Sequence, residues 1–279
     1  MTPSLQTKLS LINVETATPS MEGHIADFLG ALKDRITGIK QRFSSANTTL
    51  SSKEYQNILN NLGNIDYMAV RDVAVPTPPH FQGNMEAYIE KLAVAFEVTR
   101  GFLKSTLIPA RAHFGYLLSN PDLLRSVSRS AMPPQYVSPR SSVENLKADI
   151  VKFHNPAQST SLVPFGRLYG NVQQFKTAIA TTGNLYGTVE NDPQLSMTAI
   201  LKVVDDIGGL LDKIHLRGRQ DPVKYEMSID VSREIANVVF DIAEAVEFFG
   251  ALHQMFATIK HGHIDPAVNT IEMSMQATK

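Results

Sequence analysis

An unbroken series of apolar residues between Val231 and Ile259 is the clearest pattern in the chain. Steps of four and three residues alternate along the series, which is Val231, Ile235, Val238, Ile242, Ala245, Phe249, Leu252, Phe256 and Ile259. The average step of about 3.5 residues keeps one face of an α-helix against a neighbouring helix. We therefore predict a helix with a buried seam roughly 40 Å long. Val239, Val246 and Phe248 widen the seam, which favours a bundle core over a two-helix coil.

A second long helix is predicted after Asn84, a residue type that caps helix N-termini. Its seam has the same alternating steps and consists of Met85, Ile89, Leu92, Phe96, Thr99, Leu103 and Thr106. Pro109 lacks a backbone N–H group, so we expect a kink near Ser105. The helical pattern then resumes and ends at Asn120 and Pro121.

Shorter amphipathic patterns predict further helices over residues 20–43, 51–62, 141–153, 162–183 and 196–214. Ser141 and Glu144 have the spacing of a capping box at the start of one of them. The helix over residues 196–214 and the helix from Val231 are adjacent in sequence and have matching seams. We expect these two to form an antiparallel hairpin.

These patterns predict a mainly α fold, a bundle of long antiparallel helices with a kinked helix near Pro109. A few short strand-like segments are expected at the termini and around residues 66–75, where apolar and polar positions alternate. The expected organisation, which is also compatible with one continuous domain, is an extended N-terminal arm (1–19), an N-terminal helical region (20–125), a flexible linker or loop (126–142), a C-terminal helical bundle (143–262) and a C-terminal tail (263–279).

Both ends of the chain carry strand-like apolar residues that have no evident partner in a helical fold. They are Leu9, Leu11, Val14, Ile271, Met273 and Met275. A strand with unpaired edges is a template for pairing with another chain. We therefore predict that these residues form an interface with other protein subunits, in a homo-oligomer or a larger assembly.

His261, His263 and Asp265 form the cluster that most resembles a metal site. On an extended chain, alternating residues point to the same side, which would bring the two imidazoles and the carboxylate together. However, the cluster lies where a helix ends, without identifiable supporting residues. We favour a polar helix end, in which His261 interacts with the negative end of the helix dipole, and we predict no metal and no cofactor.

Arg125, Arg129 and Arg140 lie in a serine-containing stretch with no acidic residue between Asp122 and Glu144. Such a stretch has the chemistry to contact phosphate. The whole chain, however, has 26 basic and 27 acidic residues, a formal charge of −1, and no recognisable nucleic-acid-binding motif. We therefore favour a solvated loop over a nucleic-acid site.

Composition and motifs exclude several classes of protein. The absence of cysteine excludes disulfides, thiolate metal sites and cysteine nucleophiles. No apolar run approaches the ~18 residues of a membrane span, and residues 1–20 have no signal-peptide pattern, so we expect a cytoplasmic protein, or a virion protein if it is viral. Walker, Gly-x-Ser-x-Gly, His-Glu-x-x-His and kinase motifs are absent.

The combined patterns favour a non-enzymatic structural or assembly protein, such as a component of a viral (phage) virion or its scaffold. It would act through helix packing and exchange of its terminal arms. One alternative is a helical adaptor or regulatory protein that binds a partner helix, with adaptable contacts from Met227, Met255, Met273 and Met275. Another is an all-helical enzyme whose pocket is assembled from distant residues.

Overall fold

A computed structural model describes residues 67–78, 81–125, 136–155, 157, 160–191, 196–264 and 266. The predicted arm over residues 1–19 and the helices predicted over residues 20–43 and 51–62 lie outside these ranges, as does most of the predicted tail. The mainly α class that the sequence predicts is confirmed. The elements are α4 (Tyr67–Arg71), β1 (Ala74–Pro76), α5 (Met85–Ser119), the 3-10 turn η2 (Pro121–Leu124), α6 (Arg140–Val151), β2 (Leu162–Pro164), α7 (Phe165–Tyr169), α8 (Val172–Asn191), α9 (Met197–Gln220), α10 (Ile229–Ile259) and the π-helical turn η4 (Lys260–Ile264).

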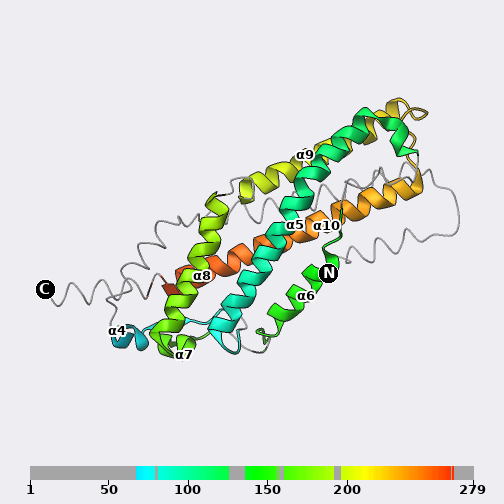
Figure 1. Ribbon diagram of the computed structural model, residues 1–279. Coiled ribbons are helices and arrows are strands. Elements are labelled where there is room, and N and C mark those ends of the chain that lie inside the picture. Colours follow the sequence, from blue (N-terminus) through cyan, green and yellow to red (C-terminus); the bar gives the residue numbers. More distant parts are fainter. Residues whose placement is uncertain are drawn as a thin grey trace.

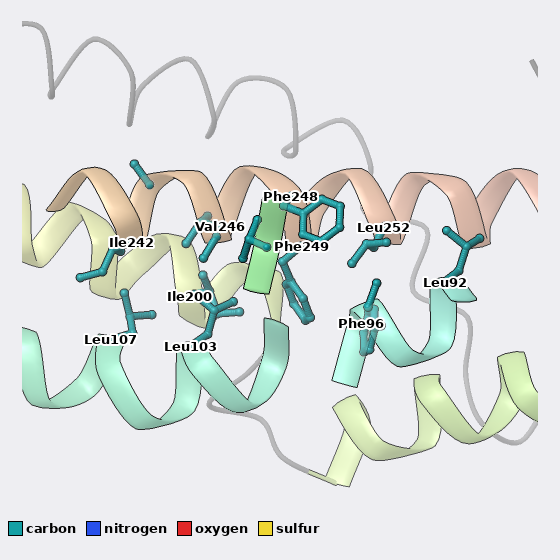
Figure 2. Close-up of a cluster of buried hydrophobic side chains, with 14 of the residues drawn as sticks. Leu92, Phe96, Leu103, Leu107, Ile200, Ile242, Val246, Phe248, Phe249 and Leu252 are labelled. Carbon is teal, nitrogen blue, oxygen red and sulfur yellow. The ribbon is translucent and has the colours of Figure 1, made fainter. Parts of the chain in front are cut away.

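Helices α5 and α10 form the centre of the core (Figure 1). Every residue of both predicted seams is buried, which confirms the two seams. The ring of Phe96 in α5 lies 4.7 Å from that of Phe249 in α10 and meets the ring of Phe256 edge-on at 5.9 Å. Figure 2 shows the side chains of the two helices facing one another, with Phe96 beside Phe249.

The two central helices run in opposite directions. The N–H of Ser228, just before α10, donates to the carbonyl of Leu124, just after α5, at 2.9 Å. At the other end Phe96 and Phe256 meet. Helices on both sides of residues 126–142 therefore share one hydrophobic cluster.

The predicted hairpin between the helix over residues 196–214 and α10 is wrong. Helix α9 has its main contacts with α5, and α6 and α8 also pack on α5 (Figure 1). The reason is that α5 buries more than its seam, since Ala95, Leu107, Ala110 and Phe114 are buried as well. Helix α5 therefore offers apolar surface to several neighbours, and adjacency in sequence does not decide which helix packs on which.

Helix α5 continues through Pro109 and ends before Asn120, as the pattern predicts. The kink expected near Ser105 stays a prediction.

Helix α9 is longer than predicted and runs to Gln220, so only residues 221–228 connect it to α10. Its last turn contains basic side chains, which interact favourably with the negative end of the helix dipole without being buried.

Two predicted helix caps are present and one is not. The side chains of Asn84 and Ser196 each accept a hydrogen bond from the backbone N–H three residues further on, at 3.0 and 3.2 Å. The capping box at Ser141 is wrong, because α6 already begins at Arg140. Pro139 has helical backbone angles and its carbonyl accepts the first helical hydrogen bond, so the proline starts the helix earlier.

The single helix predicted over residues 162–183 is wrong. The chain forms β2, α7 and α8 there, and Gly170 with φ +49° separates the two helices. A backbone with positive φ ends a helix at little cost only at glycine. The side chain of Asn171 then accepts a hydrogen bond from the N–H of Gln174 at 2.9 Å at the start of α8, which continues through Gly183.

The strand predicted around residues 66–75 is confirmed in part. Strand β1 pairs with β2 in an antiparallel sheet, with Val75 opposite Val163. Residues 67–71 form the short helix α4 instead. Four consecutive apolar residues fit a helical turn as well as a strand, and burial of Val70 at the core favours the turn.

No helix within the described residues combines the length and the apolar character that crossing a membrane requires. The expectation of no membrane span is therefore confirmed for this part of the chain.

Phe249→Asp is expected to lower the free energy of unfolding by several kcal/mol, because it places a carboxylate against the ring of Phe96 in the centre of the core. Urea unfolding followed by circular dichroism measures the change. Leu216→Asp on the outer side of α9 is the matched control, since Leu216 is exposed, and its unfolding midpoint should move little. Equal effects of the two substitutions would place Phe249 in solvent and contradict the packing of α10.

Candidate functional site

The outer face of α5 carries a second series of small and apolar side chains, and these are exposed. We call this series the outer stripe. It consists of Val94, Val98, Gly101, Ser105, Ile108, Ala112 and Tyr116. From Val94 to Ala112 its steps alternate between four and three residues, as in the buried seam. Val94 is 53% exposed and Tyr116 is 55% exposed. The stripe runs for roughly 33 Å along one helix and has the spacing of a surface that packs on another helix.

A column of charged residues follows one side of the outer stripe. Its members are Glu90, Glu97, Lys104 and Arg111, spaced seven residues apart, and we call it the charged column. Seven residues are close to two helical turns, so the four side chains share one side of α5. Glu97 pairs with Arg100 at 2.7 Å, and Arg111 pairs with Asp206 of α9 at 3.1 Å. The pair of Arg111 and Asp206 is half-exposed, where ion pairs contribute little to stability, and the pair of Glu97 and Arg100 is partly buried.

A buried carboxylate anchors the segment before α6 to α10. Asp241 is 3% exposed and accepts hydrogen bonds from the hydroxyl of Tyr136 at 2.5 Å and from Nε and Nη2 of Arg140 at 3.2 and 2.9 Å. The guanidinium of Arg140 also lies 5.1 Å from the centre of the Phe240 ring. Burial and the adjacent Asp241 carboxylate raise the pKa of Tyr136, which keeps its hydroxyl protonated as a donor.

The same face of α10 makes a second polar contact with α6. Nζ of Lys147 lies 2.8 Å from Oε1 of Glu244 and 5.5 Å from the centre of the Phe248 ring. Asp241, Glu244 and Phe248 are spaced three and four residues apart, so they form one row along α10. Helix α6, which packs mainly on α5, is thus also fixed to α10 by charge-assisted contacts.

A second buried polar cluster joins three segments that are distant in sequence. His263 of η4 is fully buried, with Nε2 2.6 Å from the carbonyl oxygen of Pro76 in β1. Because a carbonyl only accepts, Nε2 carries the proton, and Nδ1 accepts a hydrogen bond from the hydroxyl of Tyr169 in α7 at 2.9 Å. Burial lowers the pKa of His263 to about 4 and raises that of Tyr169, so both side chains are neutral at pH 7.

The residues of the candidate metal cluster are not arranged as expected. Residues 260–264 form a helical turn, so the premise of an extended chain is wrong. His261 is exposed and His263 is buried, and both ring nitrogens of His263 are already hydrogen-bonded within the protein. Asp265 lies outside the described residues. Among the residues that the structure describes, no group of three or more histidine, aspartate or glutamate side chains is placed to hold a metal ion.

The arginines considered for phosphate contact are engaged within the protein where the structure describes them. Arg140 binds Asp241, and Nη2 of Arg125 donates to the backbone carbonyl of Val223. Arg129 lies outside the described residues. The expected terminal interface lies outside them too, since its residues are Leu9, Leu11, Val14, Ile271, Met273 and Met275.

Sequence reasoning missed both the outer stripe and Asp241, although the sequence contains a signal for each. Two series with alternating steps of four and three are interleaved on the helix from Met85, and only one was recognised as a contact surface. Asp241 is a single acidic residue between Phe240 and Ile242 in the predicted seam helix. A charged residue at such a position is stable only with a partner, which indicates a buried ion pair.

Comparisons of the chain with protein-family models, with curated proteins and with solved structures found no match.

Acid is expected to destabilise the fold between pH 6.5 and pH 4, in part through His263. Its pKa is about 4 when folded and about 6.5 when unfolded, so the unfolded chain binds the proton first and stability falls as the pH drops through this window. The full loss is about 3 kcal/mol, reached near pH 4. His263→Gln should flatten the dependence when urea unfolding is measured at several pH values. An unchanged slope in this variant would show that His263 is not buried as a neutral side chain.

Asp241→Ala is expected to lower the free energy of unfolding by about 2–4 kcal/mol, because Tyr136 and Arg140 lose their shared acceptor in a buried position. Asp206→Ala is the matched control, since its pair with Arg111 is half-exposed and should contribute about 0.5 kcal/mol or less. Urea unfolding measures both. Similar small effects for the two variants would mean that Asp241 is solvated.

Proposed function

We propose that this protein is a non-enzymatic structural or assembly protein that acts by packing helices against other protein subunits, including further copies of itself. The observation that supports the proposal most directly is the outer stripe of α5. Exposed apolar side chains at helical spacing along one helix are typical of a surface that another helix covers. The predicted setting in a virus particle or its scaffold stays a prediction, as does the exchange of terminal arms.

The buried polar clusters support a scaffold role over a catalytic one. The Asp241 carboxylate, the Tyr136 hydroxyl and both ring nitrogens of His263 are hydrogen-bonded to other groups of the same chain. Each contact joins one element to another, namely the segment before α6 to α10, and η4 to α7 and β1. Groups used in this way hold helices in place.

The alternative of an adaptor with a methionine-lined groove receives less support. Met227 and Met255 are partly buried and pack against the hydrophobic core. In this position they fill space within the bundle, which is the common use of methionine. Met273 and Met275 lie outside the described residues.

The full-length protein is expected to self-associate when its mass is measured by size-exclusion chromatography with light scattering from about 1 to about 200 µM, because association removes the exposed apolar side chains of the outer stripe from water. Replacing Val98 and Ile108 together by aspartate should shift it toward the monomer. Leu216→Asp is the control, since this apolar residue is also exposed, at 54% against 44% for Val98 and 41% for Ile108, but lies on α9, outside the outer stripe. A protein that stays monomeric over the whole range contradicts the proposed function.

A further inference from the structure

We propose that a second copy of this chain binds along the outer stripe of α5, with the two α5 helices antiparallel and related by a two-fold axis near residues 99 and 100. This inference rests on the proposed function and specifies its partner and geometry. Two observations lead to it, the spacing of the outer stripe and the order of charges in the charged column.

The outer stripe is complementary to itself when one copy is reversed. In the proposed register, Val98 lies opposite Gly101 of the second copy, and Val94 lies opposite Ser105. In both of these pairs the larger side chain meets a small one, so the two helices interdigitate near the two-fold axis. At the ends, Ile108 covers the aliphatic part of Lys91 in the second copy. No neighbouring atom lies within 4 Å of the position that a Cβ would occupy at Gly101, so the centre of the stripe is open.

The charged column determines the direction and the register. Along α5 it has two acidic residues, Glu90 and Glu97, followed by two basic residues, Lys104 and Arg111. In an antiparallel pair this order is its own complement, so that Glu97 faces Lys104 of the second copy and Glu90 faces Arg111. The two-fold axis repeats both contacts, which gives four ion pairs beside the stripe. A parallel pair in register would instead place the charged column of each copy beside the uncharged Phe102 and Pro109 side of the other, so none of these four ion pairs would form.

The present partners of the charged column do not prevent this arrangement. The pair Arg111–Asp206 is half-exposed, where ion pairs contribute little. The pair Glu97–Arg100 is partly buried within one turn of α5, and a carboxylate can accept more than one hydrogen bond, so Glu97 can keep Arg100 and also pair with Lys104 of the second copy. The other side of the stripe carries Phe102 and Pro109, which are half-buried and uncharged. The only charged side chain that the second copy covers among the described residues in line with the stripe is Lys91 at each end, whose ammonium group lies 3.9 Å from Asp149 and can stay in water. Figure 1 shows α5 with α8 and α9 on one side and α6 on the other.

Reciprocal charge reversal tests the pairing in the full-length protein. One variant carries Glu90→Lys and Glu97→Lys, which makes the whole column basic. The other carries Lys104→Glu and Arg111→Glu, which makes it acidic. We expect each variant alone to self-associate about tenfold or more weakly than the wild type, because four attractive pairs become repulsive. An equimolar mixture should recover association, since basic columns then face acidic ones. Circular dichroism melts confirm that each variant is folded.

Cysteine crosslinking tests the register independently, because the chain has no cysteine of its own. Val98→Cys and Gly101→Cys proteins are mixed and oxidised under mild conditions, and mass spectrometry identifies the disulfides. The antiparallel register predicts a mixed disulfide between residue 98 of one copy and residue 101 of the other. A predominant disulfide between two copies of residue 98 indicates a parallel pair and overturns the inference.

The failure of this inference and that of the proposed function are distinguishable. A wild-type protein that self-associates while both charge-reversal variants do so equally well assembles through another surface, which overturns the inference and leaves the proposed function intact. The inference is also overturned, and the proposed function left intact, if an equimolar mixture of the two charge-reversal variants does not recover association. A wild-type protein that is monomeric at all concentrations overturns both.

Discussion

The contact between α5 and α10 is the interaction on which the rest of the structure depends. Each helix has a seam with the same alternating spacing, and the aromatic rings of Phe96, Phe249 and Phe256 meet between the two helices. Burial of aromatic side chains contributes more per residue than any other apolar contact. Because α5 is also the surface on which α6, α8 and α9 pack, the other helices take their positions from this pair.

The buried polar contacts fix the positions of the helices relative to one another, which apolar packing alone does not determine. Apolar faces tolerate sliding and rotation, whereas the hydrogen bonds of Asp241 to Tyr136 and Arg140 fix α6 at one position along α10. His263 does the same at the other end, where it links η4 to β1 and α7. Burial of such groups is costly unless all partners are in place, so each cluster disfavours alternative packings.

The sequence predicts those features of the fold that depend on local spacing. The two seams, the caps at Asn84 and Ser196 and the mainly helical class all follow from periodicity and from side chains close in the chain. It does not predict which helices pack together, because α5 is apolar on several faces and α9 could pack on either of two partners. It also fails at Gly170, where a single positive φ interrupts an otherwise continuous apolar pattern. The sequence contains both interleaved series of α5 but does not show which of them faces solvent. Only the exposure of the side chains in the structure identifies the outer stripe as the candidate contact surface.

The polar link between His263 and Pro76 joins residues 187 positions apart. During synthesis on the ribosome, α5 emerges long before α10, so its seam has no partner while the intervening helices are being made. Contacts of such large sequence separation form late and slow down folding. The nascent chain therefore carries the seam of α5 without α10 until α10 has been made, and transiently exposed apolar surface of this kind is prone to aggregation.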